Sequence, residues 1–522
     1  MIATTHTACI EGIRAIPIQV EVKAGGGGMP GFRIVGLAEG AVKESKVRVL
    51  AALSRCGYHF ASDSVTVNLA PADIRKSGSS YDLAIAVGLL IARGVVPQPE
   101  AASYLLLGEL SLHATLRPVA GALPVALCAR RENRAGLILP EANAGEASMV
   151  PGTKVRGAAS LPQVVALLRG EEGDQGPVPD TAGAEDARVA ADEGGAEDGI
   201  DLSDVRGQTA AKRALAIAAA GGHNVLMIGP PGSGKTMLAR SFSGILPPLS
   251  HDESLETTAI YSVAGLLKEP GRLMARRPFR APHHTVSYGG LIGGGSPPRP
   301  GEVSLAHNGV LFLDEFPEFS RWVLDLLRQP LEDGGVTICR VWGSVSYPAR
   351  FALVAAMNPC PCGNLGSAVA ECRCSPDAAR RYTGRISGPI LDRIDMKVPV
   401  PFQSFGVIAG PRDLEGAAAL KKDVLRARRV QERRYGDTAP GAVNASVRGA
   451  VLEDVCRVAG KGRALLERAV DRFGMSARGA TRVLRVARTI ADMEEAGEID
   501  ERSIKEALHY RLECEGNSLR GG

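Results

Sequence analysis

The stretch VLMIGPPGSGKTMLARSF, residues 225–242, decides the fold. Four apolar residues predict a buried strand, and the last six are compatible with a helix. The glycines between them let successive backbone N–H groups point inward at phosphate, while Lys235 supplies positive charge and the Thr236 hydroxyl can ligate Mg²⁺. The sequence therefore predicts a phosphate loop for a nucleotide such as ATP, formed by Gly229, Pro230, Pro231, Gly232, Ser233, Gly234, Lys235 and Thr236.

Two further apolar runs end in polar residues that suit the same chemistry. VLFLDE, residues 310–315, predicts a strand after which Asp314 holds Mg²⁺, directly or through water, and Glu315 polarises the attacking water. A strand that ends in solvated acids is the alternative. The run 351–356 predicts a third strand, followed by Asn358, which can orient that water. An ordinary turn asparagine before Pro359 is the alternative there.

Phosphoryl transfer also favours rigid planar cations near the γ-phosphate. Arg393 in GPILDRID and Arg478 in GMSARGATR are candidates, although arginines are too plentiful for composition alone to select them.

These residues, in this order, resemble an AAA+ ATPase of the magnesium-chelatase-like branch, specifically the YifB/ComM family. The most specific piece is RPFRAPHHTVSYGGLIGGGSPPRPGEVSLAHNGVLFLDEFPEF, residues 277–319, whose first part is similar to the helix-2 insert of that branch. The resemblance implies that Asn358 is sensor 1, that Arg393 is an arginine finger reaching a neighbouring subunit, and that Arg478 is sensor 2 on a helical lid. It also implies a ring, a homo-hexamer, and it explains His283 and His284 as part of the motif PHHT and not as metal ligands.

The N-terminal region predicts a separate mixed domain. Alternation in 16–22 and 65–69 is typical of strands, and the apolar run 83–91 is long enough for a buried helix. VNLAPADIRKSGSSYDLAIAVGLL resembles the ribosomal-S5-like fold of the Lon protease domain. Ser80 falls near the position of the Lon nucleophile, but Leu123 stands where the lysine base would be, so we expect no protease activity and favour a structural or nucleic-acid-binding platform.

Composition supports several folded domains. The 522 residues are 45% hydrophobic, which excludes disorder throughout. Residues 171–200 carry ten acids and one base and predict a flexible linker; removing its net −9 from the chain's +4 leaves +13 elsewhere, which permits a polyanionic partner. The overall expectation is an α/β protein with an S5-like/Lon-like α+β domain (1–170), the acidic linker (171–200), an AAA+ P-loop α/β core with a helix-2 insert (201–413), and a C-terminal helical lid (414–522).

No uninterrupted apolar stretch reaches the roughly 20 residues that a membrane helix needs. The N-terminus has no basic start followed by an apolar core. We therefore expect a soluble cytoplasmic protein with no membrane partner.

Four of the ten cysteines cluster as C-x-C, nine residues, C-x-C. In an unsecreted chain such a cluster favours metal over disulfides, and four thiolates are enough to close a tetrahedral Zn²⁺ site. The C-x-C spacing is tighter than the commoner C-x₂-C, so unligated thiols are the alternative. The candidate zinc ligands are Cys360, Cys362, Cys372 and Cys374.

Between the acids and Asn358 lies GGVTICRVWGSVSYPARF, residues 334–351, which predicts a β-hairpin. In related AAA+ motors such a hairpin projects into the pore, where Arg340 and Trp342 would meet the phosphates and bases of DNA. A hairpin that packs only against its own ring is the alternative.

Two functions fit these features. The first is an ATP-driven hexameric DNA motor, resembling ComM-like branch-migration helicases that act in DNA recombination and natural transformation, with single-stranded or branched DNA as partner. The second is a chelatase-type ATPase that remodels a protein partner for metal insertion. The Lon-like N-terminal region favours the first.

Overall fold

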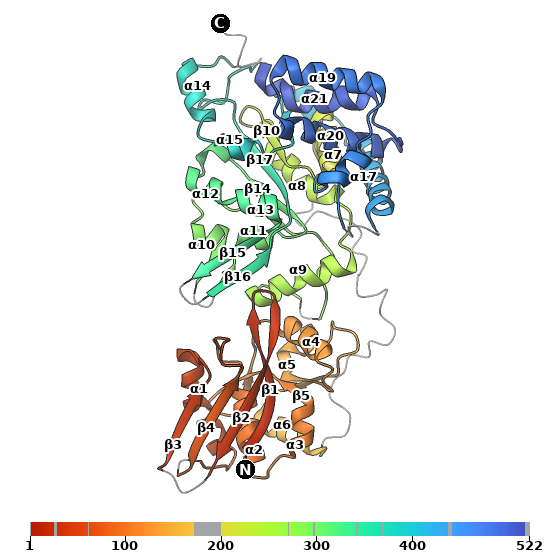
Figure 1. The fold of residues 1–522 in the computed structure, drawn as a ribbon. Helices are drawn as coiled ribbons and strands as arrows, with labels where there is room; N and C mark the ends of the chain where they lie inside the picture. Colours follow the sequence, from red (N-terminus) through yellow and green to blue (C-terminus); the bar gives the residue numbers. More distant parts are fainter. Residues whose placement is uncertain are drawn as a thin grey trace.

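The computed structural model describes residues 2–25, 29–60, 62–171, 200–269, 271–295, 298–340, 343–367, 370–436 and 441–516. We call the first part, up to residue 171, the N-terminal unit, residues 200–413 the core, and residues 414–516 the lid. Figure 1 shows the N-terminal unit at one end of an elongated molecule and the lid at the other. The expected acidic linker lies almost wholly outside the described residues.

The N-terminal unit is built on a seven-stranded sheet in the order β3-β4-β2-β1-β5-β8-β9. Helix α2 is buried at ten of its eleven positions, which explains why the sequence reads there as one unbroken apolar run. The predicted strands and the predicted buried helix of this region are confirmed. Its elements are β1 (Ile2–Glu11), β2 (Arg14–Ala24), β3 (Gly31–Val35), α1 (Gly40–Arg55), β4 (Ser64–Ala70), α2 (Asp82–Ala92), α3 (Gln98–Ser103), β5 (Tyr104–Leu106), β6 (Glu109–Leu110), β7 (Leu116–Arg117), α4 (Ala122–Arg131), β8 (Gly136–Pro140), α5 (Glu141–Ala147), β9 (Val155–Ala158) and α6 (Leu161–Arg169).

The core contains a five-stranded sheet in the order β11-β14-β17-β10-β18, in which every neighbouring pair is parallel. Its strands are short and almost wholly apolar, as expected for strands covered on both faces. Because parallel strands end at one edge, the residues that follow them meet there. The strands are β10 (Val225–Ile228), β11 (Phe279–Arg280), β14 (Val310–Leu313), β17 (Ala352–Met357) and β18 (Met396–Pro399), and the flanking helices include α7 (Thr209–Gly221), α8 (Lys235–Ile245) and α9 (His251–Ala264).

Two hairpins are inserted in this core, and we call them together the hairpin pair. The first lies between β11 and β14 and consists of α10 (Tyr288–Leu291), β12 (Gly293–Gly294), β13 (Arg299–Pro300) and α11 (Glu302–Leu305). The second is β15 (Gly335–Arg340) with β16 (Gly343–Pro348), as predicted. Tyr347 donates a hydrogen bond of 2.9 Å to the carbonyl of Pro298, so the two hairpins pack together. Trp342 lies outside the described residues, and so does the side chain of Arg340.

The remaining short elements of the core are η1 (Leu202–Asp204), η2 (Phe316–Glu318), α12 (Arg321–Leu326), α13 (Arg328–Asp333), α14 (Pro376–Thr383), α15 (Gly388–Leu391) and α16 (Phe405–Ile408).

The lid is helical from residue 414, as predicted. A fully buried carboxylate, Asp492, holds its helices together by accepting hydrogen bonds from Arg434 at 2.5 and 2.9 Å and from Arg488 at 3.0 Å. Among the described helices, none combines the length and the apolar character that crossing a bilayer requires. The lid helices are α17 (Leu414–Tyr435), α18 (Gly449–Val455), α19 (Gly460–Phe473), α20 (Ala477–Met493) and α21 (Glu501–Gly516).

The N-terminal unit packs on the core through α4 and α9, whose apolar side chains share one buried cluster with Leu273. The amide of Gly121 donates to the carbonyl of Ser262 at 3.2 Å across this contact. Nearby, the turn between β1 and β2 touches the hairpin pair, since a Cβ on Gly12 would stand 2.7 Å from the carbonyl oxygen of Ser346. The N-terminal unit is therefore in direct contact with the element predicted to meet DNA.

Candidate nucleotide site

The loop 229–236 joins β10 to α8 in the conformation that a phosphate loop needs. Gly232 and Gly234 adopt left-handed φ values of +74° and +92°, and a Cβ on Gly229 would stand only 2.0 Å from the carbonyl oxygen of Val400. Glycine is therefore required at these positions. Within the described part of the chain, the buried hydroxyl of Ser233 has no hydrogen-bond partner. An unsatisfied buried group of this kind fits a loop that is shaped for a ligand.

Lys235 is held inside this loop and is only 9% exposed. Its Nζ donates at 2.8 Å to the carbonyls of Gly229 and Pro230 and at 3.2 Å to Oδ1 of Asn358. Burial lowers the pKa of Lys235, whereas the charge of Asp314 raises it. The ammonium thus rests on neutral oxygens, and its positive charge remains available to a phosphate group.

Thr236 and Asp314 form the second part of the site. Oγ1 of Thr236 donates to Oδ2 of Asp314 at 2.9 Å, although 78 residues separate them along the chain. A hydroxyl and a carboxylate oxygen at this separation suit a hard cation such as Mg²⁺. These two residues would hold Mg²⁺, and Lys235 with the loop amides would hold the phosphates of ATP.

Glu315 follows Asp314 in a left-handed conformation, with φ of +50°. Its amide donates to Oδ1 of Asp314 at 2.9 Å, and its side chain is 60% exposed. The two neighbouring carboxylates therefore have different partners, since Asp314 accepts from Thr236 while Glu315 lies beside His284. A cavity of about 300 Å³ is lined by Thr236, Arg240, Ala281, Pro282, His283, His284, Phe312, Asp314 and Glu315.

His284 is a site residue that sequence reasoning missed. Its Nδ1 lies 3.4 Å from Oε2 of Glu315, and its ring stacks on that of His283 with 4.0 Å between centroids. Both histidines follow β11, whose Phe279 and Arg280 pair in parallel with the first residues of β14. Had the sequence identified this short strand as the neighbour of β14, the histidines would have been expected beside Glu315. The interpretation of His284 as part of the motif PHHT stands, and the structure adds its contact with Glu315.

Asn358 stands at the end of β17, where its contact with Lys235 joins it to the phosphate loop. The structure thus brings together the loop residues, Asp314, Glu315 and Asn358, as the sequence predicted. Their roles in hydrolysis remain predictions.

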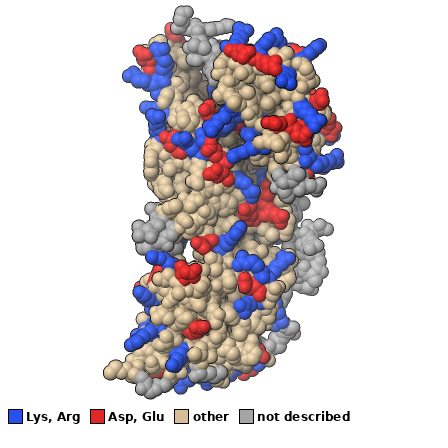
Figure 2. Space-filling view, in the orientation of Figure 1, with Lys and Arg blue, Asp and Glu red and all other residues tan. Residues whose placement is uncertain are grey.

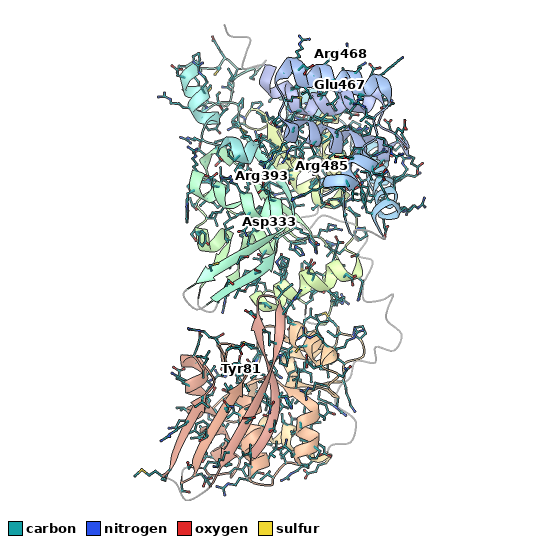
Figure 3. The ribbon with its side chains drawn as sticks, in the orientation of Figure 1. Tyr81, Asp333, Arg393, Glu467, Arg468 and Arg485 are labelled. Carbon is teal, nitrogen blue, oxygen red and sulfur yellow. The ribbon has the colours of Figure 1, made fainter. Side chains whose placement is uncertain are left out.

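Arg393 lies elsewhere, at the border of core and lid (Figure 3), and Arg478 is the second residue of α20 in the lid. Arg393 is 5% exposed; it forms an ion pair with Glu332 of α13, and its Nη1 donates to the carbonyl of Pro389 at 2.6 Å. The pKa of Arg393 is lowered, first by burial and also by the charges of Arg328, Arg478 and Arg482. The charge of Glu332 opposes this shift. Several cations are therefore gathered around Arg393, and Arg478 is an exposed member of this group.

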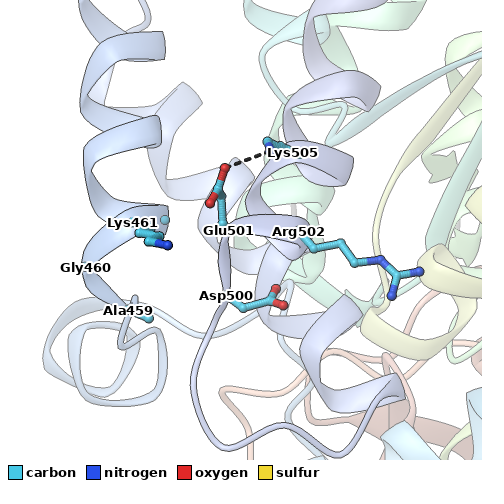
Figure 4. A pocket seen from close by; sticks show the side chains of 8 residues that line it. Ala459, Gly460, Lys461, Asp500, Glu501, Arg502 and Lys505 are labelled. Carbon is cyan, nitrogen blue, oxygen red and sulfur yellow. Dashed lines mark ion pairs between the residues drawn. The ribbon is translucent and has the colours of Figure 1, made fainter.

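A second cavity, of about 570 Å³, opens in the lid between the starts of α19 and α21. Figure 4 shows Lys461, Arg502 and Lys505 around it, with Lys505 paired to Glu501 at 2.7 Å. None of the predicted nucleotide-binding residues lines it. It is therefore separate from the nucleotide site.

The four clustered cysteines have their sulfur atoms within 4.8 Å of one another, so the cluster can hold a metal ion. Backbone N–H groups of Asn364 and Arg373 lower the pKa of Cys362 to about 6, whereas burial and the neighbouring thiols raise the pKa of Cys372 and Cys374.

In the N-terminal unit, Leu123 is fully buried and its amide donates to Glu146 at 2.9 Å. This apolar side chain offers Ser80 no base.

Replacing two residues separates binding from hydrolysis. Lys235→Ala is expected to abolish nucleotide binding because it removes the charge that faces the phosphates. Glu315→Gln is expected to bind ATP normally but to hydrolyse it about a hundredfold more slowly, because the amide cannot polarise water. Binding is measured with a fluorescent ATP analogue and hydrolysis by phosphate release. Glu318→Gln, at an exposed carboxylate paired with Arg385, is the control. Hydrolysis by Glu315→Gln at the wild-type rate would contradict the role of Glu315.

His284→Ala tests whether this histidine positions Glu315. We expect kcat to fall on the order of tenfold with KM unchanged, because a misplaced carboxylate slows the chemical step and leaves the phosphate contacts intact. His284→Asn, which keeps a side-chain donor, should recover part of the rate. The exposed His113 of the N-terminal unit supplies the control His113→Ala. An unchanged kcat in His284→Ala, or a change in KM alone, would refute the positioning role.

Comparison with known proteins agrees with the geometry. The family described as "Magnesium chelatase, subunit ChlI" matches residues 201–407, the family of its C-terminal region matches 414–511, and one described as "Subunit ChlI of Mg-chelatase" matches 20–143. The chain is 42% identical to YifB of Salmonella typhimurium over 98% of its length and 97% of the relative's. It is 41% identical to competence protein ComM of Haemophilus influenzae, again over 98% and 97% of the two chains. Similarity to the magnesium-chelatase 38 kDa subunit of Acidiphilium rubrum is 28% identity over 29% of this chain and 51% of that subunit. The chain belongs to the YifB/ComM family of magnesium-chelatase-like AAA+ proteins.

Proposed function

We propose that this chain is an ATP-driven, hexameric DNA motor, a helicase of the ComM-like kind that acts on single-stranded or branched DNA in recombination and natural transformation. The family is one of ATPases, and the observation that carries the proposal is the meeting of the phosphate loop, Asp314, Glu315 and Asn358 at one sheet edge. Similarity to ComM along nearly the whole chain supports the choice of DNA as substrate.

In this proposal each residue has a distinct task in ATP hydrolysis. Bound Mg²⁺ would supply charge neutralisation at the β- and γ-phosphates. Lys235 and the loop amides bind and orient the phosphates, while Thr236 and Asp314 hold the cation. Glu315 accepts a proton from water, with His284 keeping its carboxylate in place, and Asn358 orients that water.

In a ring, Arg393 would have to change the contacts that it makes in the single chain. Its guanidinium is paired with Glu332 and almost wholly covered, so it must leave this ion pair before it can reach a phosphate of another subunit.

Arg393→Ala should bind ATP but lose turnover, because the stabilising cation would be missing from the neighbour's site. Mixing this variant with Lys235→Ala should restore part of the ATPase activity, as each variant supplies what the other lacks across a subunit border. Arg385→Ala, at an exposed arginine of the core, is the control for loss of charge alone. Mixed rings without any rescue would argue against a finger that acts in trans.

DNA contact is assigned to the hairpin pair and not to the outer face. On the face drawn in Figure 2, Lys and Arg alternate with Asp and Glu over the lid and the N-terminal unit, so its described residues form no continuous basic stripe. The second hairpin carries Arg340 and Trp342 at its turn, which suit phosphate and base contacts. The turn between β1 and β2 touches the same hairpin, which links the N-terminal unit to it.

Remodelling of a protein partner for metal insertion is the competing proposal. The family description that matches residues 20–143 also names the chelatase, so the N-terminal region does not by itself exclude this function. Coverage favours the DNA motor, because the chelatase subunit aligns with only 29% of this chain whereas ComM aligns with 98%.

The decisive experiment measures ATP hydrolysis with and without single-stranded and forked DNA. DNA should stimulate hydrolysis, and binding should weaken steeply with salt because phosphate contacts release counterions. Arg340→Ala and Trp342→Ala should reduce this stimulation and retain hydrolysis without DNA. The chain's other tryptophan, Trp322 of α12, is 63% exposed and provides the control Trp322→Ala. If neither DNA binds or changes the rate at low salt, the protein-remodelling function replaces this one.

A further inference from the structure

The four cysteines lie in one irregular segment of the core. It runs from the end of β17 to the start of α14, and its described residues form no helix or strand. Distances between the sulfurs are 3.4 Å for Cys360 and Cys362, 3.6 Å for Cys360 and Cys372, and 3.7 Å for Cys362 and Cys372. A tetrahedron with Zn–S bonds of about 2.3 Å has edges of about 3.8 Å. Three of the sulfurs therefore stand close to the separations that one zinc ion requires, and the sulfur of Cys374 lies within 4.8 Å of each of them.

The start of this segment is connected to the nucleotide site. Cys360 is two residues after Asn358, the residue whose Oδ1 accepts a hydrogen bond from Lys235. Gly363 packs against the phosphate loop itself, since a Cβ on it would stand 2.4 Å from Cδ of Pro231. Gly363 has a left-handed φ of +81°, and its amide donates to the carbonyl of Cys360 at 2.9 Å. The first cysteine pair, Cys360 and Cys362, thus lies next to the phosphate loop.

The far end of the segment returns to the same place. Helix α14 begins at Pro376, two residues after Cys374, and carries Tyr382, which is 7% exposed. The backbone of Asn358 makes a hydrogen bond to the Tyr382 hydroxyl. Asn358 is therefore attached to both ends of the cysteine segment.

We propose that the four cysteines bind one Zn²⁺. This ion fixes Asn358 beside Lys235 and Gly363 against Pro231, so that the metal is a structural part of the nucleotide site. This inference rests on the proposed nucleotide function. A crosslink restricts the conformations open to a segment without regular hydrogen bonding, and four metal–thiolate bonds would supply that crosslink. Loss of the metal would then release Gly363 from Pro231 and Asn358 from Lys235.

The test compares zinc content with nucleotide affinity in the full chain, without DNA. Protein purified without chelator should contain about one Zn²⁺ per chain by elemental analysis. The double variant Cys372→Ser and Cys374→Ser should lose the zinc and bind a fluorescent ATP analogue on the order of tenfold more weakly. Co²⁺ added to metal-free wild type should give thiolate-to-metal charge-transfer absorption and restore the affinity. Cys56→Ser, at a cysteine that caps α1, should keep both zinc and affinity.

A second variant keeps the experiment informative if the cysteine variant fails to fold. Tyr382→Phe leaves all four ligands in place but removes the hydroxyl that is hydrogen-bonded to the backbone of Asn358, so it should retain zinc and still bind the nucleotide more weakly.

Protein without zinc, or metal-free protein that binds the nucleotide as tightly as the loaded form, would overturn the inference and leave the proposed ATPase function standing. Loaded protein that binds no nucleotide would overturn the proposed function and the coupling together.

Discussion

The nucleotide site depends on one constraint, the parallel pairing of β10, β14 and β17. The register sets Val225 beside Val354 and Val310 beside Ala352, so the three strands end at the same edge of the sheet. Asp314 and Asn358 follow β14 and β17 directly, and the phosphate loop follows β10 directly. The contacts of Lys235 with Asn358 and of Thr236 with Asp314 follow from this register. A slip of one residue would turn these side chains to the other face of the sheet.

A second network connects this sheet to the lid. Asp395, just before β18, accepts hydrogen bonds from Arg482 of α20 at 2.5 Å and from the amide of Asn224 at 3.0 Å. Although burial opposes ionisation, His223 and Arg482 hold the pKa of Asp395 at about 2. Asn224 also donates through Nδ2 to the carbonyl of Arg393 at 2.9 Å. Buried polar groups therefore join the start of β10, the lid and the segment of Arg393. A movement of the lid would displace Arg393 through these contacts.

The hairpin pair occupies the opposite end of the core, against the N-terminal unit. Val336, Ile338 and Tyr347 bury the base of the second hairpin in the same apolar cluster as β14 and β17. The base of the hairpin thus packs in one cluster with the two strands that precede Glu315 and Asn358. This arrangement gives a physical route by which changes at the nucleotide site would reach the element proposed to contact DNA, and from there the turn at Gly12.

The sequence alone predicted the strands β10, β14 and β17, the phosphate loop, the two acids, Asn358 and the cysteine cluster. Each is a local pattern in which the backbone conformation and the chemistry lie within a few consecutive residues, as with Gly232 and Gly234 in the loop. The tertiary structure decided the contacts between distant segments: His284 with Glu315, Arg393 with Glu332, and Gly363 with Pro231. These pairs depend on which strands are neighbours and on how loops fold back over the sheet edge. No local pattern contains that information, because the burial that favours each contact arises only when the whole sheet has formed.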